Sequence, residues 1–477
     1  YVEDIGEEYK GQNNMKNDDI PPGCTTEGEQ GEVTCSICGK VLKEPVSIPP
    51  TGHSYSTEWV IDKESSCTEE GEKSHHCLYC NARKDVTSVP VKEHVYSWFE
   101  TKPETCTEEG YQKYQCVCCG KEKIDVYPPL GHDWYSEVIL CEPTISEKGT
   151  KVFYCSRCEE TKKEYYEQTG LMRLYGNTRY ETMNVLLNQG TTQADTVIVC
   201  SGLNFPDALS ASSLAGKNSP ILLTDPNDLS NEVRVQIWRL NPKQIYVIGG
   251  EAAVSTGVFQ QLQGMVSNVQ RISGQTRYET SLELFKLCHE KNPNSDTVII
   301  ATGTNFADAL SISSYASYSG NPIVLCDPTN GVDSNALNLI QKYGYTKAII
   351  VGGNNAVPVL VEKQLSKAGC VSINRLSGTT RYETSIEIAK YGEKHGLSMN
   401  GAMYVTGKNY PDALAAGPIA GSIASNLLLI DEEKVDERYL ENYKNKVTKA
   451  YVIGGENAVP YGAMASVANA LKIEIHN

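Results

Sequence analysis

Three sulfurs and one imidazole recur at regular spacing in the first 170 residues. A cysteine is followed, after nine or ten residues, by a Cys-x-x-Cys pair, and 12 to 14 further residues precede a histidine. Thiolates and imidazole are the ligands with which proteins hold a structural zinc ion in a closed tetrahedron. The spacing therefore predicts three zinc sets, one within each module. Their members are Cys24, Cys35, Cys38 and His53; Cys67, Cys77, Cys80 and His94; and Cys106, Cys116, Cys119 and His132.

These modules contain almost no apolar residues, so a cross-link has to supply the stability that burial does not. Disulfides are the alternative to zinc in an oxidising extracellular compartment, but they leave one cysteine of each module unpaired. A closed set of four ligands also leaves no metal-bound water for catalysis. Cys118 and the pair His75 and His76 stand beside ligands, and we interpret them as bystanders.

A fourth copy of the module is degenerate. Cys155 and Cys158 are present, but Ile145 stands at the first cysteine position and no histidine follows. We expect this copy not to bind metal by the same scheme. A Cys155 to Cys158 disulfide, a disulfide to Cys141 or a metal-free hairpin is expected instead. The four modules are assigned to residues 23–54, 66–95, 105–133 and 140–170, after a flexible polar leader at 1–22.

The 477 residues have the composition of an ordinary multidomain globular protein, with 40% hydrophobic and 21% charged residues. No apolar run reaches the roughly 18 residues of a membrane span. Residues 1–170 contain 32 acidic and 18 basic residues, against a formal net charge of -16 for the whole chain. This acidic half disfavours nucleic acid and anionic lipid as partners. The start at Tyr1, without a methionine, a secretory segment or a lipidation signal, suggests a processed chain.

The C-terminal half consists of three copies of one design. The phrase Arg-x-x-Gly-x-Thr-Arg-Tyr-Glu-Thr begins at Arg173, Arg271 and Arg375. Short, continuously apolar runs, such as 196–200 and 244–248, alternate with segments of helical length, a pattern typical of parallel strands buried on both faces. The sequence therefore predicts three α/β repeats at residues 171–270, 271–374 and 375–477.

Each repeated phrase contains a candidate helix start. A threonine and a glutamate three residues later can cap the first turn reciprocally. The arginine between them places a positive charge where the helix dipole disfavours it. Two compensations are open: an ion pair with an aspartate of the same or a neighbouring repeat, or a bound anion held by the arginine and the helix N-terminus. The arginines are Arg179, Arg277 and Arg381, and the aspartates are Asp207, Asp308 and Asp412.

On these recurring phrases, residues 171–477 resemble the cell wall binding repeat 2 family of clostridial surface proteins and bacillar wall hydrolases. The resemblance implies three Rossmann-like units in a pseudo-threefold arrangement that attach a protein noncovalently to an anionic wall polysaccharide or teichoic-acid-like polymer. It also implicates a Pro-Ile-Leu-Leu phrase in attachment, for which a buried core strand is the alternative. The phrase corresponds to Pro220, Ile221, Leu222 and Leu223; to Pro322, Ile323, Val324 and Leu325; and to Leu427, Leu428 and Leu429, where Asn426 replaces the proline.

Other chemistry is not indicated. The repeats contain neither a dinucleotide or phosphate-binding glycine loop nor a nucleophile motif. Cys200, Cys288, Cys326 and Cys370 fall at non-equivalent repeat positions and are interpreted as core residues. We expect a non-catalytic, secreted, S-layer-associated protein at the Gram-positive wall surface, which displays zinc-bearing Cys-rich modules similar to short repeats of clostridial surface proteins. The alternatives are a modifier or accessory subunit of a wall hydrolase, and an adhesin or metal-binding array.

Overall fold

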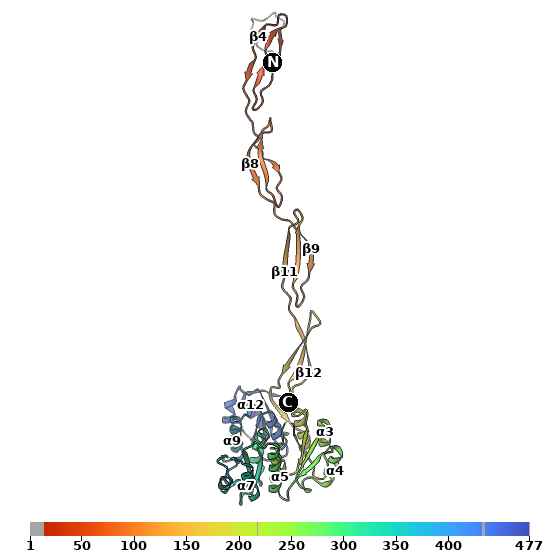
Figure 1. Cartoon of the computed structure of the whole chain (residues 1–477), viewed down its shortest axis with the longest axis vertical. Coiled ribbons are helices and arrows are strands. Elements are labelled where there is room, and N and C mark those ends of the chain that lie inside the picture. Colours follow the sequence, from red (N-terminus) through yellow and green to blue (C-terminus); the bar gives the residue numbers. More distant parts are fainter. Residues whose placement is uncertain (1–13, 217, 432–434, 477) are drawn as a thin grey trace. The chain divides into compact units, whose positions relative to one another are not determined.

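The computed structural model describes residues 14–216, 218–431 and 435–476. The chain divides into two units (Figure 1). One contains the N-terminal modules up to Tyr135 together with Tyr154–Glu160, and the other contains Ser136–Phe153 and the chain from Thr161 onward. Each unit is described by itself below.

Every N-terminal module contains a three-stranded sheet, in which a hairpin follows a first strand, and the strands of the first three modules pair antiparallel. The middle strands of the second, third and fourth modules begin at Gly71, Gly110 and Gly149, and every middle strand ends at or just before the first cysteine of its Cys-x-x-Cys pair. The strands are β1 (Asn14–Lys16), β3 (Val33–Cys35) and β4 (Val41–Lys43), with the additional pair β2 (Gly28–Gln30) and β5 (Val46–Ile48); β6 (Val60–Lys63), β7 (Gly71–His76) and β8 (Arg83–Val89); β9 (Tyr96–Lys102), β10 (Gly110–Cys116) and β11 (Glu122–Tyr127); and β12 (Trp134–Cys141), β13 (Gly149–Cys155) and β14 (Thr161–Tyr166).

The prediction of a flexible leader at residues 1–22 is wrong for residues 14–22. The strand β1 pairs antiparallel with β3, and Ile20 forms a bridge with Glu29. Residues 14–22 therefore belong to the first module, in the place that β6, β9 and β12 take in the others. The rest of the expected leader, residues 1–13, lies outside the described residues.

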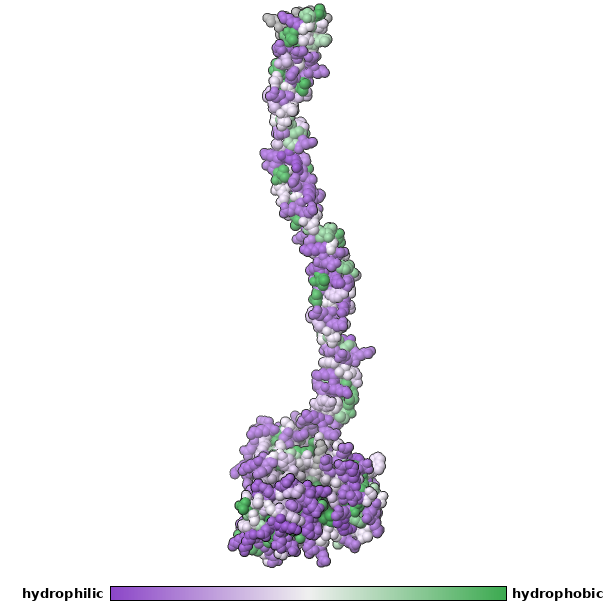
Figure 2. All heavy atoms as spheres, viewed as in Figure 1, coloured by the Kyte–Doolittle hydropathy of each residue, from purple (hydrophilic) through white to green (hydrophobic). Residues whose placement is uncertain are grey.

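The modules bury very little, as expected from their composition. Apart from Val33, Ile145 and Val152, the buried apolar side chains of residues 14–166 are cysteines. Large apolar side chains such as Trp98 and Val117 are exposed. Figure 2 shows patches of hydrophobic residues scattered over a mostly hydrophilic surface. The fold of a module therefore rests on strand pairing and on whatever joins its cysteines.

The C-terminal half folds into parallel sheets flanked by helices, which confirms the predicted α/β class (Figure 1). The first repeat contains α1 (Arg179–Gly190), β16 (Thr196–Ser201), α2 (Pro206–Ala211), β17 (Ile221–Thr224), α3 (Asn231–Leu240), β18 (Gln244–Ile248), α4 (Thr256–Met265) and β19 (Val269–Ile272). The second contains α5 (Arg277–Lys291), β20 (Thr297–Thr302), α6 (Ala307–Ser319), β21 (Ile323–Cys326), α7 (Ser334–Tyr343), β22 (Lys347–Val351), α8 (Leu360–Lys367) and β23 (Ser372–Leu376). The third contains α9 (Arg381–Lys394), β24 (Ser398–Thr406), α10 (Ala416–Ser422), β25 (Ser425–Ile430), α11 (Glu437–Leu440), the 3-10 helix η2 (Glu441–Tyr443), β26 (Lys449–Ile453), α12 (Tyr461–Leu471) and β27 (Ile475–His476).

The three repeats close on one another through their fourth strands. The sheet orders are β17-β16-β18-β19, β21-β20-β22-β23 and β25-β24-β26-β15-β27. The strand that opens each repeated phrase thus belongs to the sheet of the preceding repeat, and β15 (Gly170–Leu174) closes the sheet of the last repeat by pairing in parallel with β26. The pseudo-threefold arrangement is therefore completed within one chain.

The sheets and their helices bury a large apolar core, which includes the four cysteines of this half. Cys200 and Cys326 are fully buried in strands, as the interpretation of these thiols as core residues predicts. Among the described residues, no helix has the length and apolar character that crossing a membrane requires.

Candidate functional sites

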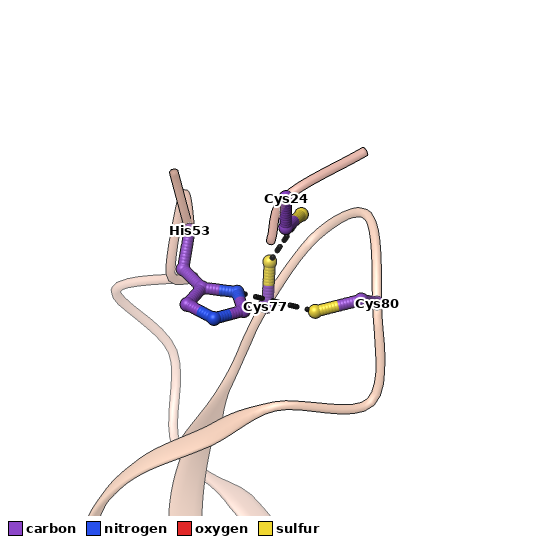
Figure 3. A group of neighbouring side chains, drawn as sticks. All are labelled: Cys24, His53, Cys77 and Cys80. Atoms are coloured by element: carbon purple, nitrogen blue, oxygen red, sulfur yellow. Dashed lines mark hydrogen bonds between the residues drawn. The ribbon is translucent and has the colours of Figure 1, made fainter. Parts of the chain in front are cut away.

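Three groups of three cysteines and one histidine come together in the N-terminal unit, each with four ligand atoms within 4.8 Å of one another. Each group joins two modules: the first cysteine and the histidine of one module meet the Cys-x-x-Cys pair of the next (Figure 3). The groups are Cys24, His53, Cys77 and Cys80; Cys67, His94, Cys116 and Cys119; and Cys106, His132, Cys155 and Cys158.

The expected grouping within single modules is therefore wrong, and the length of the middle strand explains why. In the second module, β7 spans the six residues Gly71–His76 between the turn after Cys67 and the pair that begins at Cys77. An extended strand rises about 3.3 Å per residue, so the two ends lie roughly 20 Å apart. Four ligands of one zinc ion fit within about 4 Å of one another. The first cysteine and the pair of one module therefore belong to different sites.

The spacing of the ligand atoms fits a tetrahedral Cys3His zinc site. With Zn–S and Zn–N bonds of about 2.3 and 2.05 Å, the S–S and S–N edges of the tetrahedron are about 3.8 and 3.6 Å. The Sγ–Sγ distances are 3.7 Å for Cys24–Cys77, 3.8 Å for Cys67–Cys116 and 3.7 Å for Cys106–Cys155. The distances from Sγ to the histidine Nδ1 are 3.2 Å for Cys80–His53, 3.5 Å for Cys119–His94 and 3.4 Å for Cys158–His132.

Backbone hydrogen bonds hold both halves of each site. In the half that supplies cysteine and histidine, the amide of Gly52 donates to the carbonyl of Cys24, and Gly131 does the same to Cys106. Across each junction, the residue after the first cysteine of the pair donates its amide to a residue just after the histidine. These bonds are Leu78 to Ser54 at 2.9 Å, Val117 to Val95 at 3.0 Å and Ser156 to Asp133 at 2.8 Å.

The thiols of one site differ in acidity. The backbone amide of Tyr79 lowers the pKa of Cys77 to about 6, and the amide of Cys118 does the same for Cys116. Burial raises the pKa of Cys24 to about 11 and that of Cys67 to about 12. Because zinc binds thiolates, each site would release protons when it takes up the ion.

The fourth module corrects a second expectation. Cys155 and Cys158 complete the third group, although their own module lacks the first cysteine and the histidine. None of the described cysteines forms a disulfide, so neither the expected Cys155 to Cys158 disulfide nor a disulfide to Cys141 is present among them. The side chain of Cys141 is exposed. Conversely, Cys35 and Cys38 join none of the groups found among the described residues.

Ile145, at the missing cysteine position, is 3% exposed and packs in the core of the α/β domain. The adjacent Ser146 donates its amide to the carbonyl of Gln189 in α1 at 3.3 Å. The side that supplies cysteine and histidine in the other modules thus docks on the α/β domain in this one. The side chains interpreted as bystanders join none of the groups found among the described residues, and His76 instead contacts the carboxylate of Asp62 at 2.6 Å.

The second candidate site lies where the three α/β repeats meet. The rings of Phe205, Phe306 and Tyr410 pack together with centroid distances of 6.1, 5.3 and 5.5 Å. They are half-buried and occupy equivalent positions just before the repeated aspartates. Arg277 lies over the ring of Phe205 at 5.9 Å and Arg381 over that of Phe306 at 5.5 Å. We call these rings, together with Arg179, Arg277 and Arg381, the axial face.

The start of each repeated helix confirms the predicted capping. Thr178, Thr276 and Thr380 accept the amide of the glutamate three residues on, and each glutamate accepts an amide just before the threonine. The arginine between them donates to a glycine carbonyl at the end of the neighbouring strand. The bonds are Arg179 to Gly202 at 2.5 Å, Arg277 to Gly303 at 2.6 Å and Arg381 to Gly407 at 2.5 Å.

The arginines act on the repeated aspartates across repeats. Burial raises the pKa of Asp207, and the charge of Arg277 lowers it by less; Arg381 acts in the same way on Asp308. For Asp412, burial again raises the pKa, and a hydrogen bond with Thr182 and then the charge of Arg179 lower it by less. Each aspartate thus faces the arginine of the next repeat, and the third faces the first. None of these pairs is a direct ion pair among the described residues, so a glycine carbonyl and a more distant carboxylate together compensate the helix-start charge.

The first arginine of each phrase has a different role. Arg173 donates to the carbonyls of Gly454 and Val459 at 2.9 and 2.8 Å. Arg271 and Arg375 bond in the same way to Gly249 and Gly352. Gly249, Gly352 and Gly454 directly follow the third strands β18, β22 and β26, so these arginines support the fold rather than the axial face.

The Pro-Ile-Leu-Leu phrases lie in the core. The strands β17, β21 and β25 contain them, and Ile221, Leu222, Leu223, Ile323, Val324, Leu325, Leu427, Leu428 and Leu429 are at most 4% exposed. Pro220 and Pro322 are buried as well. The expectation of direct polymer contact by these side chains is thus not supported, and the alternative of a core strand describes them.

Two features escaped the sequence interpretation. The first is that each Cys-x-x-Cys pair shares a site with the cysteine and histidine of the preceding module. The sequence does indicate this, because the fourth module keeps its pair but lacks both the first cysteine and the histidine. The second is the aromatic cluster. The sequence indicates it as well, since an aromatic residue follows an asparagine at the same position of every repeat, as Phe205, Phe306 and Tyr410.

Three α/β repeats that close on one another, in a chain that also contains an array of Cys/His modules, define a tandem-repeat protein. The repeats match the family described as cell wall binding domain 2 (CWB2) at residues 173–259, 271–362 and 375–463. These matches cover more than half of the chain, and the protein belongs to this family.

Two curated relatives from Bacillus subtilis (strain 168) match this chain. N-acetylmuramoyl-L-alanine amidase LytC is 29% identical over 303 residues, which are 63% of this chain and 58% of that protein. The protein named amidase enhancer is 32% identical over 307 residues, 64% of this chain and 40% of its own length. The chain thus spans only about half of these relatives.

Two solved structures from Clostridium difficile share the fold. Cwp6 aligns with a TM-score of 0.58 and 18% identity over 96% of this chain and 68% of its own. Cwp8 aligns with a TM-score of 0.57 and 20% identity over 98% of this chain and 81% of its own.

Proposed function

We propose that this chain is a non-catalytic surface protein of a Gram-positive bacterium, in which the α/β domain binds an anionic wall polymer and zinc ions join the N-terminal modules. Family membership supports attachment to the cell wall. The axial face supports the chemistry of attachment, and it is the observation that carries the proposal.

The axial face offers one guanidinium per repeat around a shared aromatic cluster. Arginine binds carboxylate and phosphate groups through directed, charge-assisted hydrogen bonds. Helix N-termini add backbone amides that favour the same anions. Half-buried aromatic rings such as Phe306 present apolar faces against which the apolar face of a sugar ring can pack. A polymer of charged sugars meets all three features on this face.

Repetition supports binding through many weak contacts. Arg179, Arg277 and Arg381 occupy equivalent positions of one scaffold, so a polymer held at one of them is presented to the others at high effective concentration. Useful attachment then needs no single strong contact. Since the contacts are electrostatic and partly exposed, retention on the wall falls as salt increases.

The matched experiment replaces Arg179, Arg277 and Arg381 together by glutamine and measures retention on purified walls beside thermal melting. The control replaces Lys243, Lys347 and Lys449, which lie at the opposite, amino-terminal ends of the third strands, one in each repeat. Both variants lose three positive charges. We expect retention to fall by more than about tenfold only in the arginine variant, with both variants still folded. Equal retention of the two variants, or melting of the arginine variant, contradicts the proposal.

Zinc is the metal that suits the N-terminal groups. Three thiolates and one imidazole at tetrahedral spacing form a structural zinc set, which when occupied supplies stability rather than an activated water. The cysteines and the histidine of each group would hold the ion across a junction, and modules with so small a core would depend on it. Elemental analysis is the test, with about three zinc ions per chain as the expected content.

A role as an accessory to a wall amidase is the second candidate. The match with the amidase enhancer favours it. Amidase activity on walls, measured with and without the purified chain, separates the two functions. A rise in activity supports the accessory role, and unchanged activity with the chain bound supports attachment alone.

A further inference from the structure

The Cys-x-x-Cys pair of the first module has no partner among the described residues, although it is built like the pairs that have one. The amide of Cys35 donates to the carbonyl of Lys40, and that of Gly39 donates to Cys35, both at 2.9 Å. The same bonds hold the third module's pair, from Cys116 to Lys121 at 2.8 Å and from Gly120 to Cys116 at 2.9 Å.

The conformation and exposure of the pair also match. Gly39 and Gly120 adopt φ angles of 72° and 75°, which place the second cysteine of each pair beside the first. Cys35 is 7% exposed, as is Cys77, while Cys38 is exposed like Cys119. Cys35 and Cys38 therefore present the same half of a metal site that the other pairs present.

The other half has to be a cysteine and a histidine from the end of another module. All three such ends in residues 24–132 are already engaged in complete groups. No cysteine precedes Cys24 and no histidine precedes His53, so residues 1–23 do not supply it either.

We propose that Cys35 and Cys38 are the receiving half of a fourth zinc junction, completed by the cysteine and histidine of another module of this design. The inference rests on the proposed zinc sets. It gives the array two different ends: Ile145 closes one of them by docking on the α/β domain, and Cys35 with Cys38 leaves the other able to take a further module.

The test supplies the missing half on a second copy of the chain. A donor chain carries Cys77→Ser and Cys80→Ser, which release Cys24 and His53, and Cys35→Ser and Cys38→Ser, which prevent its self-association. The unmodified chain is the receiver, and a receiver with only Cys35→Ser and Cys38→Ser is the control. Zinc is added to equimolar mixtures, which are followed by sedimentation velocity.

We expect donor and unmodified receiver to form a species of twice the monomer mass that chelator dissolves. The control receiver is expected to associate at least about 100-fold more weakly, because two of four ligands are gone. Monomers in both mixtures overturn the inference, if elemental analysis shows three zinc ions in the unmodified chain. If that chain holds no zinc, the inference falls together with the proposed zinc sets.

Two sources can supply the further module: the same polypeptide or a different one. The chain taken from the cell surface distinguishes them by its zinc content and mass. A fourth zinc ion in the monomer indicates the same polypeptide, and a fourth ion found only in larger species indicates a different one. Three ions in every species overturn the inference.

Discussion

Replacing Cys155 and Cys158 by serine separates zinc sites between modules from zinc sites within them. These cysteines belong to a module without its own first cysteine and histidine, yet they lie with Cys106 and His132. If the groups bind zinc as found, the variant loses one of three ions. If each module bound its own ion, the variant would lose none.

Cys35→Ser with Cys38→Ser is the matched control, because it gives the opposite result. It leaves all three complete groups intact, so three ions are expected. If each module bound its own ion, this variant would instead lose the zinc ion of the first module. The two double variants remove the same atoms from equivalent Cys-x-x-Cys turns, so only the grouping of ligands differs between them.

The size of the effect follows from the ligand count. A complete structural set binds zinc with about 10–16 kcal/mol, an apparent Kd between roughly 50 nM and 2 pM. A cysteine and a histidine alone hold the ion far more weakly, and a colorimetric chelator at micromolar concentration removes it. The assay is chelator-resistant zinc per chain. Three resistant ions in the Cys155 and Cys158 variant, or two in the control, would refute the grouping.

The remaining predictions concern the α/β domain. Burial raises the pKa of Asp308 above its usual value, so the charged form of this side chain opposes folding at neutral pH. Asp308→Asn is therefore expected to raise the melting temperature at pH 7. The difference in melting temperature between the variant and the unmodified chain should shrink as the pH falls toward the usual aspartate pKa. Ile145→Ala creates a cavity where the fourth module docks and is expected to cost about 2–5 kcal/mol of unfolding free energy, whereas Ile139→Ala, on an exposed side chain, is expected to be nearly neutral. Leu222→Ala is expected to cost a similar 2–5 kcal/mol, and to weaken wall retention only to the extent that it unfolds the domain. Val235→Ala, on an exposed side chain of α3, is its control. Retention lost by a fully folded Leu222→Ala variant would restore a direct contact.

The fold of the C-terminal half could be predicted because each of its signals is local. Apolar runs such as β16 are buried on both faces, and the Thr-x-x-Glu boxes cap their own helices. The way in which the third repeat closes on the first could not be predicted from such local signals. The position of β15 in the sequence does not tell whether this strand joins the first sheet or the last. Its parallel pairing with β26 shows that it joins the last.

The metal ligands show the same limit. Ten of the twelve predicted ligands lie in a group, because cysteine and histidine at these spacings have few other uses. Their partners were predicted wrongly, because closeness in sequence is no guide across an extended strand such as β7. Arg179 and Arg277 were singled out by their place at a helix start, but the aromatic cluster between them depends on how the repeats meet.

The central proposal is attachment through an anionic polymer, and retention on intact and extracted walls tests it most directly. The full chain is mixed with purified walls, and with the same walls after their anionic polymer has been removed, at low and at high salt. We expect strong retention on intact walls at low salt, and loss of retention after extraction and at high salt. Equal retention on both kinds of wall, independent of salt, would contradict it.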